Sequence, residues 1–394
     1  MLERTTHKSA PQELVNALVC LYNEGKIEEV YTRSLPLIRE YPDTSAIHNI
    51  MGAISYQKGD KGSAIEYFRK VIELNPDHPH AYNNLGATLV DLEEYEEAKK
   101  VIGEAIHLQP DYAEAYNNLG NVHKELEEYD QAIAQYEKAI ELNPRYYEAY
   151  NNLGVALGKN EQYEEAAEVL KNTIHMKPEF AEAYNTLGAI LTDWEKYEEA
   201  KQALLEAISI APDNAKAYNN LGNAYERLDE YDQAIVQYEK AVELNPQYYQ
   251  AYNNLGAALS NIEKYEEAQK VLKQAIQINS KFAESYHNMG LIFRLTGNYD
   301  EAIKHQRMAV SLKPEDENNF QVLLFSLNYS PDMSAEEIYD YYRQYDQKFG
   351  LPLKSKWKPF AQTKAPKNKL RIGYVSPDFK EHSMRNFLEP VLTH

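Results

Sequence analysis

Apolar and small residues recur along most of the chain in two short patterns that alternate. The first pattern, AEAYNNLGNVHKEL at residues 113–126, places Tyr116, Leu119 and His123 on one face of a helix. The second, YDQAIAQYEKAIEL at residues 129–142, repeats the same helical periodicity. A proline then follows, and it disfavours helical geometry in the residue before it. The pattern predicts two amphipathic helices joined by a tight turn.

This two-helix pattern returns every 34 residues. A glycine marks each copy in the first helix: Gly52, Gly86, Gly120, Gly154, Gly188, Gly222, Gly256 and Gly290. An alanine follows each glycine in the second helix: Ala64, Ala98, Ala132, Ala166, Ala200, Ala234, Ala268 and Ala302. These residues are small, as expected where two helices cross closely. Eight units therefore run over residues 45–316, and a degenerate capping unit at 11–44 precedes them.

The period, the glycine and the alanine together resemble the tetratricopeptide repeat. The resemblance covers residues 45–316 and is specific, since eight consecutive units match in phase. It implies an all-α fold, a right-handed superhelix or α-solenoid, in which the first helix of each pair lines the concave side. The 33 tyrosines of the chain are then expected in core and inter-repeat packing rather than in an aromatic cage for a cofactor.

Two adjacent asparagines stand before the glycine in most units, although asparagine is unfavourable inside helices. The second asparagine of each pair forms a series that we name the asparagine ladder: Asn84, Asn118, Asn152, Asn220, Asn254 and Asn288, with Thr186 interrupting it. The first asparagines and one further position are also candidates for peptide binding: Asn117, Asn151, Asn219, Asn253, Asn121 and Asn223. Carboxamides offer both donors and an acceptor, so a row of them suits the main chain of an extended peptide.

Two alternatives to peptide binding remain open for these asparagines. They could form hydrogen bonds between neighbouring repeats, or they could be inherited by duplication. Residues 113–146 and 215–248 are identical at 25 of 34 positions, which favours duplication of a three-repeat block. A carboxylate clamp for acidic C-terminal tails is disfavoured, because lysine and arginine are scarce at these positions.

Composition narrows the class of partner. Lysine and arginine total 41 against 61 aspartate and glutamate residues, a net charge of −20, which argues against nucleic acid and anionic membranes. No apolar segment is long enough for a signal peptide or a membrane span, and Cys20 is the only cysteine. We expect a cytoplasmic protein, without cofactor or metal, that binds extended segments of other proteins. A homodimer through the superhelix stays open.

The chain changes character after the repeats. Residues 317–350 predict a helical extension, with Ser334 and Glu337 forming a capping box at the start of its second helix. Residues 351–369 are rich in lysine and proline, and predict an extended basic linker. Residues 370–394, KLRIGYVSPDFKEHSMRNFLEPVLTH from Lys369 on, predict the first strand, loop and helix of an α/β domain. Residues 1–10 are expected to be disordered.

The segments LLFSLNYSPDMSAEEIY and LRIGYVSPDFKEHS, following tetratricopeptide repeats, resemble bacterial members of the O-linked N-acetylglucosamine transferase and SPINDLY-like family. The resemblance implies transfer of a sugar from a UDP-sugar or GDP-sugar donor to serine or threonine. His382 falls on the family's loop histidine, which implies a catalytic position in an intact enzyme. The sequence ends at His394, before the family's donor-binding lobe, so we expect this polypeptide to be inactive as written.

These features support three functional hypotheses. The first is a substrate-recognition superhelix of a protein O-glycosyltransferase without its catalytic domain, which holds an extended peptide with the asparagine ladder. The second is a complete glycosyltransferase that continues beyond His394, and the sequence following His394 would separate it from the first. The third is a non-catalytic tetratricopeptide scaffold for a multiprotein complex.

Overall fold

The computed structural model describes residues 9–330 and 332–356 of the 394-residue chain. Within these residues the fold is entirely helical, and they contain no β-strand. The described residues divide into two units, one up to residue 333 and one from residue 334 to residue 356.

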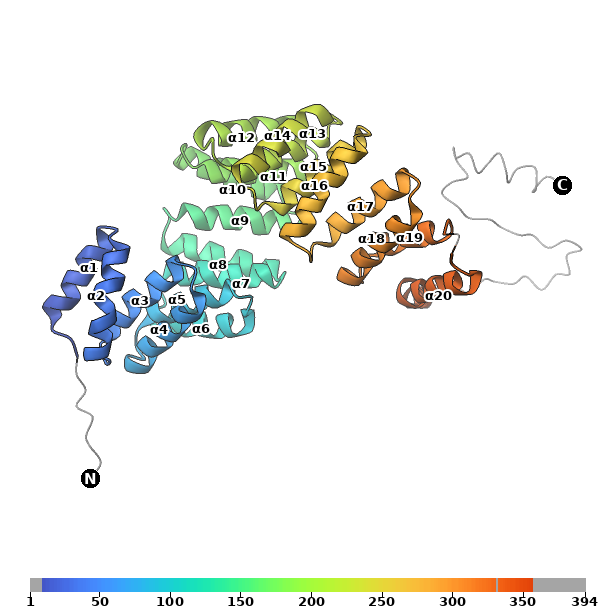
Figure 1. Ribbon diagram of the computed structural model, residues 1–394. Helices are drawn as coiled ribbons and strands as arrows, with labels where there is room; N and C mark the ends of the chain where they lie inside the picture. The colour runs from blue at the N-terminus through green and yellow to red at the C-terminus, as the bar shows by residue number, and fades with distance from the viewer. Residues whose placement is uncertain (1–8, 331, 357–394) are drawn as a thin grey trace, which may run out of the picture. The chain divides into compact units, whose positions relative to one another are not determined.

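The first unit is a succession of helix pairs followed by one further helix (Figure 1). Its helices are α1 (Gln12–Asn23), α2 (Ile27–Glu40), α3 (Ser45–Gln57), α4 (Lys61–Leu74), α5 (Pro79–Val90), α6 (Tyr95–Leu108), α7 (Ala113–Glu125), α8 (Tyr129–Leu142), α9 (Tyr147–Lys159), α10 (Tyr163–Met176), α11 (Ala181–Asp193), α12 (Tyr197–Ile210), α13 (Ala215–Glu226), α14 (Tyr231–Leu244), α15 (Tyr249–Asn261), α16 (Tyr265–Ile278), α17 (Ala283–Leu295), α18 (Tyr299–Leu312) and α19 (Glu317–Leu327). The helices predicted at 113–126 and 129–142 are confirmed as α7 and α8.

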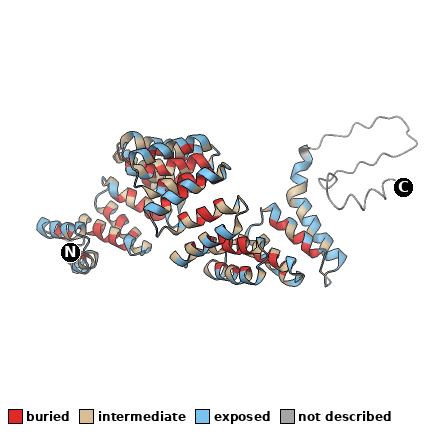
Figure 2. Cartoon of the chain, turned by 90° about the horizontal axis from the view of Figure 1, so that it is seen from above, coloured by how far each residue is buried: buried red, intermediate tan, exposed pale blue. Residues whose placement is uncertain are grey.

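Each odd-numbered helix packs against its own partner and against the odd-numbered helices of the neighbouring pairs. Helix α7, for example, contacts α8 and also α5 and α9. Buried residues accordingly line the inner faces of the pairs along the unit (Figure 2). The odd-numbered helices therefore have two buried faces, one toward the even-numbered helix and one toward the adjacent repeat.

Small residues allow the close crossing within each pair, as predicted. The eight alanines of the repeat signature are all fully buried: Ala64, Ala98, Ala132, Ala166, Ala200, Ala234, Ala268 and Ala302. A Cβ atom added to Gly120 would lie 2.6 Å from Cε1 of Tyr136, and one added to Gly222 would lie 2.5 Å from Cε1 of Tyr238. At these crossings a glycine is needed because the partner's ring occupies the space of a side chain.

The turn inside each pair contains a residue in the left-handed backbone region. In three turns this residue is glycine, at Gly25, Gly59 and Gly297. In six turns it is acidic: Glu93, Glu127, Glu161, Glu195, Asp229 and Glu263. Non-glycine residues are strained in this conformation. The sequence pattern did not reveal these positions.

The described part of the second unit is also helical. Helix α20 (Ala335–Tyr345) is capped by Ser334, whose side chain accepts from the backbone N–H of Glu337, while the Glu337 side chain accepts from the N–H of Ser334. The predicted capping box is therefore confirmed. A π-helical turn (Asp346–Gly350) and a 3₁₀ helix (Leu351–Lys356) follow.

Two boundary predictions need correction and one lies outside the structure. Leu351–Lys356 were predicted to begin an extended linker, and they form a 3₁₀ helix instead. The backbone N–H of Ala10, predicted to be disordered, donates to Oγ1 of Thr44 at 2.7 Å. The strand, loop and helix predicted at 370–394 lie outside the described residues, and so does His382.

Candidate functional site

The first asparagine of each pair lies in the interface between repeats. Asn117, Asn151, Asn219 and Asn253 are 5%, 4%, 5% and 7% exposed. The sequence predicted them as candidates for peptide binding on the first helix, which was expected to line the concave side. That placement overlooked the second buried face of the odd-numbered helices, the one that packs against the next repeat. Burial leaves these four side chains little surface for a partner protein.

The ladder asparagines directly follow the first asparagines in the sequence, and their side chains are half-buried. Five of them donate an amide hydrogen from Nδ2 to the carboxamide oxygen of an asparagine 35 residues earlier. The Nδ2 to Oδ1 distances are 2.9 Å for Asn118 to Asn83, 3.0 Å for Asn152 to Asn117, 2.9 Å for Asn220 to Asn185, 3.1 Å for Asn254 to Asn219 and 3.0 Å for Asn288 to Asn253. These bonds connect each repeat to the one before it and give the five ladder amides the same orientation.

Two buried carboxamide oxygens show where this arrangement is interrupted. Within the described residues, Oδ1 of Asn151 has no hydrogen-bond partner, because Thr186 replaces the asparagine that would donate to it. Oδ1 of Asn49 is also unpaired there, and no bond joins it to Asn84. The ladder is thus a regular inter-repeat contact that is interrupted at Thr186 and does not extend from Asn84 to Asn49.

The two nearly identical repeats carry a further polar contact. The fully buried hydroxyl groups of Tyr136 and Tyr238 each donate to an asparagine of the preceding helix, with distances of 2.8 Å to Oδ1 of Asn121 and 2.8 Å to Oδ1 of Asn223. Burial raises the pKa of both tyrosines, so they remain protonated donors. Asn121 and Asn223 are half-buried, and each keeps its amide N–H groups directed away from the tyrosine.

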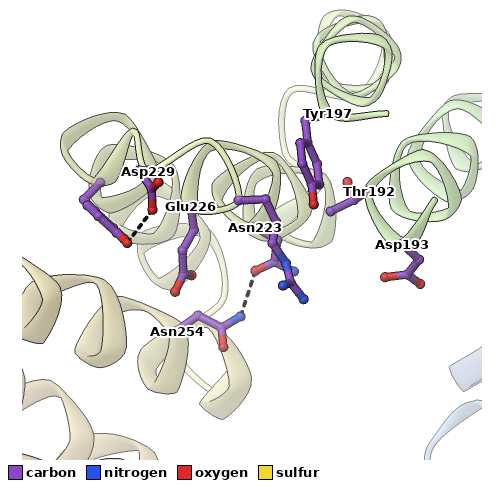
Figure 3. Close-up of a pocket in the computed structure, with 9 residues that line it drawn as sticks. Thr192, Asp193, Tyr197, Asn223, Glu226, Asp229 and Asn254 are labelled. Carbon is purple, nitrogen blue, oxygen red and sulfur yellow. Dashed lines mark hydrogen bonds between the residues drawn. The ribbon is translucent and has the colours of Figure 1, made fainter. Parts of the chain in front are cut away.

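A polar pocket of about 650 Å³ lies beside Asn223 and Asn254 (Figure 3). Helices α11, α13 and α15 contribute to it, together with the starts of α12 and α14. Its lining includes Thr192, Asp193, Tyr197, Asn223, Glu226, Arg227, Asp229, Tyr231 and Asn254. Burial raises the pKa of the Glu226 carboxyl, and Oε2 of Glu226 lies 2.8 Å from the Tyr238 hydroxyl. The ladder residue Asn254 and the titratable carboxyl group of Glu226 therefore line the same pocket.

Sequence reasoning missed Glu226 and Tyr238, although a signal for them existed. The aligned repeats 113–146 and 215–248 differ at few positions, and one of these is Lys124 in the first and Glu226 in the second. A carboxylate in place of an ammonium group beside a shared tyrosine marks a local change in chemistry. The contact between Glu226 and Tyr238 arises only in the folded structure, since the two residues lie on different helices.

Nothing in the described part of the chain is arranged as a metal site, and none of its helices combines the length and hydrophobicity that crossing a bilayer requires. His123 forms one further close contact between helices, with Nδ1 2.6 Å from Oε2 of Glu128. Hydrogen bonds from His123 and Lys99 lower the pKa of the Glu128 carboxyl. This cluster connects α6, α7 and the start of α8 and serves packing.

Comparison with known proteins agrees with this architecture: stacked helix pairs with an interface between repeats define the class of α-solenoids. Models described as tetratricopeptide repeat match residues 55–122, 148–177, 215–248 and 247–315, and a model described as TPR repeat matches 120–161 and 188–229. The described helix pairs therefore form a tetratricopeptide-repeat solenoid.

Sequence relatives were found over short segments. The probable UDP-N-acetylglucosamine–peptide N-acetylglucosaminyltransferase SPINDLY of Hordeum vulgare is 35% identical over 83 residues, which is 21% of this chain and 9% of the relative. The SPINDLY protein of Solanum lycopersicum is 31% identical over 85 residues, 22% of this chain and 9% of the relative. The match thus spans about a tenth of the length of these relatives.

One solved structure supports the fold alone. It is described as the crystal structure of the APC/C hetero-tetramer Cut9-Hcn1, and it superposes with a TM-score of 0.55 at 15% sequence identity. The superposition covers 76% of this chain and 59% of that chain.

Proposed function

We propose that the solenoid binds extended segments of other proteins through the asparagine ladder, on the concave face of a right-handed superhelix. Tetratricopeptide repeats bind peptide segments of other proteins, and the ladder repeats at the interval of one helix pair. The observation that carries the proposal is the uniform orientation of five ladder amides. Each uses one N–H on the preceding repeat, and its carboxamide oxygen can then meet the main chain of a bound segment. Asn254 uses its second N–H on Asn223, whereas the other four can offer theirs to the segment as well.

This proposal refines the contact predicted from sequence. The first asparagines hold the repeats in register, and the ladder asparagines carry the contact to the peptide. Asn121 and Asn223 extend the row at the two repeats with a buried tyrosine. Main-chain recognition of this kind places few demands on the sequence of the segment, which suits a protein with many substrates.

The experiment uses a 12-residue peptide selected from a display library on the full chain. Replacing Asn118, Asn152, Asn220 and Asn254 together by alanine should weaken its binding by about 30-fold or more, since each hydrogen bond contributes roughly 0.5–1.5 kcal/mol. N-methylation of the peptide backbone should weaken binding to the unmodified protein to a similar degree. Peptide binding that tolerates both changes would contradict the proposal.

A matched control separates peptide contact from repeat packing. Alanine at the four acceptors, Asn83, Asn117, Asn185 and Asn219, breaks the same inter-repeat bonds and leaves the ladder side chains in place. If the ladder contacts the peptide, this control should retain more affinity than the ladder variant. Equal losses in the two variants would assign the ladder to packing between repeats.

We further propose that this recognition serves a protein O-glycosyltransferase that transfers sugar from a nucleotide donor to serine or threonine. The similarity to two SPINDLY proteins, and the SPINDLY-like segments that follow the repeats, support this assignment. The test is a chimera in which residues 45–316 replace the repeats of the barley protein. Labelled sugar transferred to the selected peptide would support the assignment. A chimera that binds the peptide and modifies its own former substrates only would favour the scaffold alternative.

A further inference from the structure

The Tyr238 hydroxyl contacts two hydrogen-bond acceptors at once. It lies 2.8 Å from Oδ1 of Asn223 and 2.8 Å from Oε2 of Glu226. A phenol carries one hydrogen and can donate it to one of these oxygens only. The second short contact needs a hydrogen from another group, because two oxygens without one would face each other with lone pairs. The tyrosine ring is fully buried, so bulk water does not relieve the conflict.

Reversal of the Asn223 amide does not supply this hydrogen. Oδ1 of Asn223 also accepts from Nδ2 of Asn254 at 3.1 Å, and reversal would bring two NH₂ groups together. Asn254 in turn is oriented by its bond to Oδ1 of Asn219, at 3.1 Å. That bond runs in the same direction as the four other inter-repeat bonds. The carboxamide oxygen of Asn223 therefore faces Tyr238 and takes its hydrogen.

We propose that Glu226 holds a proton in the folded protein and donates it to the Tyr238 hydroxyl, which donates to Asn223. Glu226 is then a positioning residue: through Tyr238 it fixes the amides of Asn223 and of the ladder residue Asn254. Its effect on peptide affinity rests on the proposed function, whereas the proton itself does not. Loss of the proton would draw the tyrosine hydrogen to the carboxylate and leave Oδ1 of Asn223 with Asn254 as its remaining donor.

The surroundings of Glu226 favour the neutral carboxyl. Its burial raises the pKa, since a low-dielectric environment disfavours the charged form. The ionisable groups that line the pocket around it are Asp193 on α11, Tyr197 on α12, Arg227 directly after α13, Asp229 in the turn between α13 and α14, and Tyr231 at the start of α14. Among them Arg227 alone is cationic, and it lowers the pKa of Glu226. Helix α15 contributes the neutral Asn254. Figure 3 shows the Glu226 and Asn254 side chains on the same side of the pocket.

The related repeat provides an internal control. Tyr136 donates to Oδ1 of Asn121 at 2.8 Å, and in the described part of the chain its hydroxyl has no second acceptor. The position of Glu226 is occupied there by Lys124, whose Nζ lies 3.1 Å from Oε1 of Glu125. The single hydroxyl hydrogen of Tyr136 thus has a single acceptor, Oδ1 of Asn121, and repeat 113–146 needs no protonated carboxyl group.

The test follows the side-chain carboxyl carbons of glutamate by NMR in the full chain as pH is raised, with Glu226 assigned from Glu226→Gln. We expect Glu226 to titrate above the ordinary glutamate range, and the side-chain amide signals of Asn223 and Asn254 to shift at the same midpoint. The amide signals of Asn121 should not follow that midpoint. A Glu226 that titrates in the ordinary range, or amides that ignore its titration, would overturn the inference.

Three variants separate the steps. Glu226→Gln is a permanent neutral donor, so the Asn223 and Asn254 signals should keep their low-pH positions at every pH. Tyr238→Phe removes the hydroxyl group between Glu226 and Asn223, so the Asn223 and Asn254 amide signals should no longer shift when Glu226 titrates. Tyr136→Phe, the matched control, should leave the Glu226 titration unchanged. Persistence of the coupled shifts in Tyr238→Phe would contradict a connection through that hydroxyl.

Peptide binding provides the functional readout. The selected peptide should bind the natural chain several-fold more weakly above the Glu226 titration than below it, and Glu226→Gln should bind equally at both. If NMR shows that Glu226 titrates above the ordinary range but peptide affinity does not change with pH, Asn254 does not contact the peptide. That result would contradict the proposed function at this repeat. The NMR titration alone decides where the proton resides.

Discussion

Asn151 shows at the level of one side chain how neighbouring repeats are held together. Its carboxamide is 4% exposed, and within the described residues its oxygen has no partner, whereas the equivalent oxygens of Asn117 and Asn219 accept from the next repeat. A buried acceptor without a donor loses its hydrogen bonds to water without replacement, at a cost of about 1–3 kcal/mol. The break at Thr186 is therefore a local weakness in the interface.

Thr186→Asn should repair this weakness. The new amide would stand where ladder residues stand in adjacent repeats and would donate to Oδ1 of Asn151. We expect stabilisation by about 1 kcal/mol, the net value of one satisfied buried hydrogen bond. The measurement is the urea midpoint of unfolding, with hydrogen exchange in α9 and α11 as a local readout. Asn220→Thr, the reverse change one repeat later, should destabilise by a similar amount. Equal midpoints for all three proteins would show that the amide bond contributes nothing to stability.

Within each helix pair, the closeness of the crossing and the shape of the turn determine which residues are tolerated. The crossing was predictable, because a glycine and an alanine recur in phase and small residues permit close contact. The strained turn was not, because acidic residues such as Glu161 and Asp229 carry no sequence signal for a left-handed backbone. The ladder was predictable as a period. The burial of the first asparagine of each pair was not, because the sequence pattern did not reveal the second interface of the odd-numbered helices, the one with the neighbouring repeat.

Gly120→Ala tests the crossing. The added methyl group would lie 2.6 Å from the Tyr136 ring, which is itself fully buried. Overpacking of this kind costs typically 1–3 kcal/mol, which thermal unfolding would detect. Gly103→Ala is the control, because Gly103 lies inside α6 with nothing within 4 Å of the new Cβ. That change should stabilise by roughly 0.5–1 kcal/mol through helix propensity. Equal effects of the two substitutions would argue against the crossing as the reason for the glycine.

Glu161→Gly tests the turn. Glu161 has φ of 61°, a conformation that glycine adopts without steric penalty and other residues do not. Relief of this strain should exceed the entropy cost of glycine and stabilise the protein by about 0.5–1 kcal/mol. Gly297→Ala, at φ of 79° with open space around the Cβ, should destabilise by about 1 kcal/mol. A loss of stability in Glu161→Gly would show that the glutamate side chain outweighs its backbone strain.

At the scale of the whole solenoid, stability arises from each helix pair and its contacts with adjacent pairs. Contacts between helices are confined to the same or the neighbouring pair throughout the first unit. Repeat proteins of this kind behave approximately as one-dimensional chains, and whole repeats can be removed without loss of the fold. The interruption of the ladder at Thr186 then depends on which repeats are neighbours. Deletion of a whole repeat changes the neighbours without any point substitution.

Removal of residues 181–214 should close the ladder. The deletion takes out one 34-residue period together with Thr186, and it places Asn220 opposite Asn151, where Nδ2 of the former can donate to Oδ1 of the latter. Removal of residues 147–180 deletes the same length but leaves Thr186 opposite Asn117, so an acceptor remains unpaired. Both proteins should fold with equal helical content by circular dichroism. The first should be more stable in urea by about 1 kcal/mol, and adding Thr186→Asn to the second should remove the difference. A second deletion protein that is already as stable as the first would show that continuity of the ladder does not set the strength of the interface.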